Sequence, residues 1–78
     1  MNEIILRLTP IMHRIFEDST IIVTPNLTAK DIEKWTSMTN AIFIAEIEKE
    51  FAFKFHFRDV MNLKNIGDLI SVIEKKIA

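Results

Sequence analysis

The sequence has 78 residues, of which 49% are hydrophobic and 27% are charged. This is the composition of one globular domain spanning residues 1–78, with no room for a second. A chain of this size buries only about 60% of its unfolded surface, which argues against an enzyme cleft built from several layers of structure. Ten Lys and Arg residues against 11 Asp and Glu residues give a net charge of −1, so we expect no nucleic-acid partner.

Cysteine is absent from the sequence, which excludes disulfides, thiolate metal sites and cysteine catalysis. The N-terminal segment has an acid at Glu3 and a base at Arg7, an order that does not fit a secretory signal peptide. No apolar run approaches the ~20 residues of a membrane span. We therefore expect a cytoplasmic protein, and the initial Met1 indicates a free-standing chain.

From Ile4 to Phe16 the apolar residues recur at steps of three and four, which predicts a helix with one apolar face. Pro10 falls inside this helix, where a missing N–H and steric crowding cost about 3 kcal/mol. Two outcomes are open. Either the helix kinks at Pro10, or Thr9 caps a shorter helix that has Pro10 as its first residue.

Residues 17–36 are rich in turn and cap formers and predict a long loop with a short helical turn near residues 30–34. Ile32 and Trp35 are expected to anchor the second half of this loop on the bundle. A second helix is predicted from Ser37, because Phe43, Ile47 and Phe51 recur every four residues.

The span 53–57 alternates Phe with polar residues, which is the period of a strand. We reject a strand, because no second strand of comparable quality is present to pair with it. A short helix around residues 58–63 follows. Asn65 then caps a last helix with an acid in its first turn and two lysines in its last. The predicted fold class is therefore all-α.

The segment WTSMTNAIFIAEIEKEF, residues 35–51, resembles the serine-bearing second helix of acyl carrier proteins. Upstream, VTPNLTAKDIEKW is similar to the family's loop, and downstream, LKNIGDLISVIEKKI is similar to its last helix. The resemblance covers essentially the whole chain. It implies a four-helix acyl-carrier-protein-like bundle with a long loop between the first two helices and a short third helix.

In this resemblance, Ser37 stands at the position of the serine that carries 4′-phosphopantetheine, a covalent cofactor from coenzyme A whose thiol holds acyl groups as thioesters. A hydroxyl at a helix N-terminus is exposed, and a phosphate attached there meets backbone N–H groups and the favourable end of the helix dipole. An ordinary N-cap role for Ser37 is the alternative, since Ser is a preferred cap. Thr36 departs from the Asp that the family nearly always has before the serine, which bears on the efficiency of modification.

The resemblance also implies a surface on which partner enzymes dock. Met38, Ile42 and Ala45 share one side of the second helix, and Glu46 is placed to steer basic surfaces towards it. The alternative is that Met38 and Ile42 belong to the core and that Glu46 is part of a solvated face. The first two turns of this helix contain no acid, whereas many carriers have acids there, so we expect less electrostatic recognition than usual.

The predicted bundle interior consists of Phe43, Ile47, Phe51, Phe55, Leu63, Ile66, Leu69 and Ile73. In the family the same interior can open to shelter an acyl chain. Core packing explains these residues without that role, and the six Phe residues are expected to leave little room. His13 and His56 have no carboxylate or cysteine at ligand spacing, so no metal site is expected.

The predicted function is that of an acyl carrier protein with no catalytic activity of its own. The implied partners are a phosphopantetheinyl transferase, an acyl-activating ligase, and a synthase or acyltransferase, each bound weakly and briefly by a monomeric carrier. A different class of function remains open, in which the chain is an unmodified interaction module with a carrier-like fold. A small helical DNA-binding domain is disfavoured, because the sequence lacks a basic recognition helix.

Overall fold

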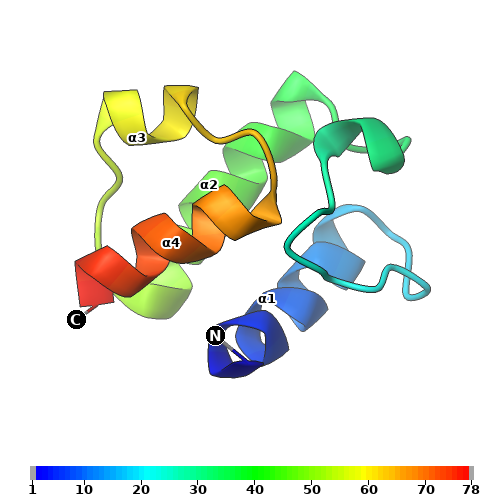
Figure 1. Cartoon of the computed structure of the whole chain (residues 1–78). Coiled ribbons are helices and arrows are strands. Elements are labelled where there is room, and N and C mark those ends of the chain that lie inside the picture. Colours follow the sequence, from blue (N-terminus) through cyan, green and yellow to red (C-terminus); the bar gives the residue numbers. More distant parts are fainter. Residues whose placement is uncertain (1, 78) are drawn as a thin grey trace.

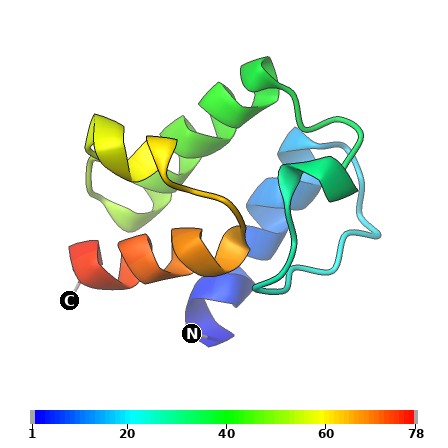
Figure 2. The ribbon, with the colours of Figure 1, turned by 45° about the horizontal axis from the view of Figure 1, so that its top comes forward.

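The structure, a computed structural model, describes residues 2–77 and leaves Met1 and Ala78 outside. In chain order its elements are α1 (Asn2–Ile15), a short 3-10 helix η1 (Ala29–Asp31), α2 (Ser37–Phe51), α3 (Phe57–Met61) and α4 (Ile66–Ile77). Residues 2–77 contain no strand, and the predicted all-α class is confirmed. Figures 1 and 2 show α1 and α3 lying apart, with η1 beside the start of α2.

The first helix runs through Pro10 without ending. The Thr9 hydroxyl does not cap a helix, because it donates a hydrogen bond to the carbonyl of Ile5 at 2.7 Å, one turn back. The hypothesis of a shorter helix beginning at Pro10 is therefore wrong. Pro10 and Leu6 are both exposed, so the Leu6 carbonyl that lacks an amide donor lies on the solvent side of α1.

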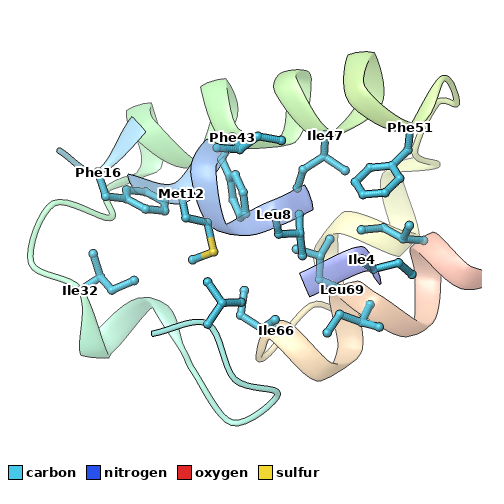
Figure 3. Close-up of a cluster of buried hydrophobic side chains, with 14 residues drawn as sticks. Ile4, Leu8, Met12, Phe16, Ile32, Phe43, Ile47, Phe51, Ile66 and Leu69 are labelled. Carbon is cyan, nitrogen blue, oxygen red and sulfur yellow. The ribbon is translucent and has the colours of Figure 1, made fainter. Parts of the chain in front are cut away.

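The core is a single cluster of apolar side chains from α1, α2, α4 and the connection between α1 and α2. Figure 3 shows Leu8 and Met12 of α1 lying between Phe43 and Ile47 of α2 and the α4 side chains Ile66 and Leu69. Burying each such side chain stabilises the fold by roughly 1.5–3 kcal/mol. The buried members are Ile4, Leu8, Ile11, Met12, Phe16, Val23, Ile32, Phe43, Ile47, Phe51, Ile66, Leu69, Ile70 and Ile73.

The connection between α1 and α2 is anchored by Ile32 and Trp35, as predicted. Ile32 is buried. The Trp35 ring stacks on Phe16 at a centroid distance of 4.8 Å and meets Phe43 edge-on at 5.4 Å. Its Nε1–H donates to Oδ1 of Asn40 at 2.9 Å. The predicted helical turn is present, but at Ala29–Asp31, slightly earlier than residues 30–34.

The same connection holds the start of α4. The carbonyls of Pro25 and Leu27 accept hydrogen bonds from the N–H groups of Gly67 and Ile66 at 2.8 and 2.9 Å. A Cβ on Gly67 would lie 3.2 Å from the Pro25 carbonyl oxygen, so glycine allows this close approach. Asn65 Oδ1 accepts from the Asp68 N–H at 2.8 Å, which confirms the predicted cap.

The third helix spans Phe57–Met61, one residue earlier at its start than predicted and two residues earlier at its end. Phe57 is 80% exposed, and Phe55 and Leu63 are only partly buried. The expectation that all six phenylalanines fill the interior is therefore wrong at Phe57, whereas Phe55 and Leu63 pack against the core from its edge. The span 53–56 is not a strand, in agreement with the sequence analysis.

Candidate functional site

Ser37 is the first residue of α2, and its side chain is exposed. The residue before it, Thr36, is the N-cap, since its Oγ1 accepts a hydrogen bond from the N–H of Thr39 at 3.3 Å. Thr39 Oγ1 in turn accepts from the Thr36 N–H at 2.8 Å. The alternative that Ser37 is the capping residue is therefore wrong, and the Ser37 hydroxyl makes no hydrogen bond with residues 2–77.

A cavity of about 320 Å³ lies beside Ser37, at the lower end of the range for small-molecule pockets. It is bounded by residues of α2, α3, α4, η1 and the chain that joins α3 to α4. Its apolar walls include Phe43, Ile44, Val60, Leu63 and Leu69. The cavity opens to solvent at Ser37 and Lys64, and the lining residues Phe43, Ile66 and Leu69 are themselves buried. The expectation that phenylalanine packing leaves little room inside the bundle stays a prediction.

The acids of α2 are tied to other parts of the fold. The first turn of α2 contains none. In the second half of the helix, three acids form ion pairs: Glu46 with Arg14 at 2.6 Å, Glu48 with Lys54 at 3.9 Å, and Glu50 with Arg7 at 2.9 Å. The charge of Glu46 is thus offset by a base of α1, which weakens the steering role that the sequence analysis gave to it.

The apolar residues that precede these acids face solvent. Met38 is 75% exposed and Ile42 is 50% exposed, and Ala45 is also exposed. The interpretation that Met38 and Ile42 belong to the core is therefore wrong. Ile44 differs, because it lines the cavity. Exposed apolar side chains thus begin directly after Ser37.

Both histidines form hydrogen bonds that hold neighbouring parts of the fold together. His13 Nε2–H donates to the carbonyl of Ile21 at 2.8 Å, which ties α1 to the following connection. The backbone N–H of His56 donates to Oδ2 of Asp59 at 3.1 Å. Within residues 2–77 the structure places no three His, Asp or Glu side chains together as a metal site would require. In the same range, no helix is both long and apolar enough to span a membrane.

Lys64, which was not predicted from the sequence as a site residue, also lines the cavity. No local signal marks this residue, since it follows α3 in a short connection and is one of ten basic residues in the chain. Its place beside the cavity depends on how that connection packs against α2.

Comparisons with family models and with curated proteins find no match. Among solved structures, the fold is similar to the solution NMR structure of a holo acyl carrier protein from Geobacter metallireducens. The TM-score is 0.88 at 34% sequence identity, and the match covers 94% of this chain and 84% of that chain. This chain belongs to the acyl carrier protein family. The resemblance seen in the sequence is confirmed, and the fold is that of a carrier.

Proposed function

We propose that Ser37 carries 4′-phosphopantetheine and that the protein presents acyl or related carboxyl groups, held as thioesters on this arm, to biosynthetic enzymes of the cytoplasm. The observation that carries the proposal is the Ser37 hydroxyl itself. It is exposed, has no hydrogen-bond partner within residues 2–77, and lies beside a cavity in a fold of the carrier family.

The start of α2 fits a phosphodiester. The first N–H groups of a helix have no partner within the helix, and together with the helix dipole they favour an anion. The N–H of Thr39 donates to the Thr36 hydroxyl. The N–H groups of Ser37 and Met38 have no carbonyl acceptor within the helix and are the ones that a phosphate could use. The first turn of α2 contains no acid that would repel a phosphate.

When attached, the arm supplies the thiol that forms the thioester. The chain contains no cysteine that could compete for the acyl group. The apolar cavity beside Ser37 offers room for part of the arm or for the cargo. The residues of the carrier thus attach, orient and shelter a group on which other enzymes act.

The partners in this proposal are a phosphopantetheinyl transferase, an acyl-activating ligase, and a synthase or acyltransferase. We assign their docking to Met38, Ile42 and Ala45, which are exposed close to Ser37 on α2. Glu46 lies at the edge of this surface and contributes less to attracting basic partners, because its charge already pairs with Arg14.

The proposal is tested by incubating the protein with coenzyme A, Mg²⁺ and a broad-specificity phosphopantetheinyl transferase and recording the intact mass. We expect a gain equal to one phosphopantetheine. The gain should be lost in Ser37→Ala and retained in Ser71→Ala, a matched control at an exposed serine of α4. If no transferase that is tried produces the gain, the result would favour the alternative function, an unmodified interaction module.

A further inference from the structure

Lys64 stands out among the residues that line the cavity. Ser37 and Asn40 contribute from α2, whereas Lys64 comes from the connection between α3 and α4. Of the residues within 2–77 that line the cavity, Lys64 is the single charged one. The cavity beside the proposed attachment site therefore has a positive charge and no negative one on its walls.

The fold does not use the ammonium group of Lys64. The backbone N–H of Lys64 donates to Oδ2 of Asp68 at 3.0 Å, but its exposed side chain forms no ion pair or hydrogen bond with the described residues. Lys30, Lys49, Arg58 and Lys75 share this property, whereas Arg7, Arg14, Lys34, Lys54 and Lys76 each pair with an acid. Among the unpaired bases of residues 2–77, Lys64 is the one that lines the cavity.

The residue before Ser37 leaves this ammonium unopposed. Thr36 is neutral and caps α2, whereas an Asp at position 36 would place a carboxylate beside the same cavity. A phosphodiester on Ser37 would carry one negative charge and would be the one anion on the cavity side of Lys64, since the Asp68 carboxylate accepts from the Lys64 backbone N–H and does not line the cavity. Opposite charges that meet at a partly enclosed surface attract each other, and salt screens the attraction.

We propose that Lys64 is a positioning residue for the prosthetic arm, and that its ammonium pairs with the Ser37 phosphodiester and holds the arm against the cavity. This inference rests on the proposed function of Ser37. The role is separate from folding, because the Lys64 side chain belongs neither to the buried core nor to the cap of α2.

The test compares apo and holo forms of the wild type, Lys64→Met, Lys64→Arg and Lys49→Met. Lys49 is an exposed base of α2 that does not line the cavity. Thermal midpoints (Tm) are measured for both forms at low salt and in 1 M NaCl, and the ³¹P NMR chemical shift of the phosphodiester is recorded. Because the Lys64 side chain is exposed and unpaired, we expect apo Lys64→Met to keep the wild-type Tm.

We expect attachment of the arm to raise the Tm of the wild type by about 1–4 °C more than that of Lys64→Met at low salt. Lys49→Met and Lys64→Arg should behave like the wild type. The difference should shrink in 1 M NaCl, where the Debye length is about 3 Å. The ³¹P shift should change in Lys64→Met and stay unchanged in Lys49→Met.

Two results would overturn the inference in distinguishable ways. If the transferase adds no mass to the wild type, both the proposed function and the role of Lys64 are wrong. If the mass gain occurs but Lys64→Met leaves either the holo-minus-apo Tm difference or the ³¹P shift at its wild-type value, the role of Lys64 is wrong and the proposed function stands.

Discussion

The hydroxyl of Thr36 and the hydroxyl of Thr39 each accept a hydrogen bond from the other residue's backbone N–H, at 3.3 and 2.8 Å. This reciprocal pair begins α2 one residue before Ser37. Asp, the residue expected at position 36 from the family resemblance, is also a good N-cap. Thr36 therefore caps α2 as an Asp would, but it lacks the negative charge of an Asp.

Removal of the cap should destabilise the protein. We expect Thr36→Ala to lower the free energy of unfolding by about 1 kcal/mol, because the N–H of Thr39 then loses its side-chain acceptor. Thr36→Asp keeps an acceptor and should stay close to the wild type. Urea unfolding of the three proteins measures the difference. Equal stability of Thr36→Ala and the wild type would show that the cap contributes nothing.

The missing charge should appear in the kinetics of modification. We expect Thr36→Asp to raise the kcat/KM of phosphopantetheine transfer, because the resemblance gives this acid a part in the complex with the transferase and its magnesium ion. Thr36→Asn is the matched control, since it caps the helix without a charge. A rate that is the same in all three proteins would show that the transferase does not read position 36.

Replacement by glycine should change the free energy of unfolding in opposite directions at two alanines, Ala52 at the end of α2 and Ala41 inside it. Ala52 terminates α2 with φ 57° and ψ 51°, a left-handed conformation that costs a residue with a Cβ roughly 1–2 kcal/mol. Ala52→Gly should therefore stabilise the protein by about 0.5–1 kcal/mol, after the greater chain entropy of glycine is subtracted. Ala41→Gly, at an exposed position inside α2, should destabilise it by about 1 kcal/mol. Changes of the same sign at both positions in urea unfolding would contradict this interpretation of Ala52.

Asp59 links α3 to α4 and should make stability depend on acid pH. Its carboxylate accepts a hydrogen bond from the His56 N–H at 3.1 Å and lies 3.4 Å from Nζ of Lys76. The hydrogen bond first, and then the lysine, lower the pKa of Asp59 below its ordinary value. A lowered pKa in the folded state stabilises the fold above the unfolded value of about 3.9, and this stabilisation is lost as the pH falls through the folded pKa.

Asp59→Asn should therefore reduce the dependence of Tm on pH between about pH 5 and pH 2, and the rest should come from other acids such as Asp18, whose pKa is also lowered by its hydrogen bonds with Thr20. Lys76→Met keeps the His56 hydrogen bond and should retain the larger part of the dependence. If the wild type and Asp59→Asn gave parallel curves over this range, Asp59 would not be the source of the acid sensitivity assigned to it.

Local patterns predicted most of the fold. The four-residue spacing of Phe43, Ile47 and Phe51 predicted the buried side of α2, and all three are buried. Asn65 caps α4 as expected, because a cap depends on neighbours only three residues away. Pro10 was ambiguous, since the spacing of apolar residues did not decide between a continuous helix and a break.

Two kinds of feature could not be predicted from the sequence: a choice between two neighbouring residues of similar propensity, and contacts between residues far apart in the chain. Thr36 and Ser37 are both good caps, and their order of use appears only in the backbone geometry. Arg7 pairs with Glu50, 43 positions away, which no local pattern encodes. The cavity and the position of Lys64 beside it arise where α2, α3 and α4 meet, so they require the packed structure.

The central claim is that the Ser37 hydroxyl carries a prosthetic group. The most direct measurement is tandem mass spectrometry of the Ser37-containing peptide from the protein purified from its native host. We predict phosphopantetheine bound to this peptide, with fragment ions that place it on Ser37. A peptide recovered only in its unmodified form, or with the group on another residue, would contradict the claim.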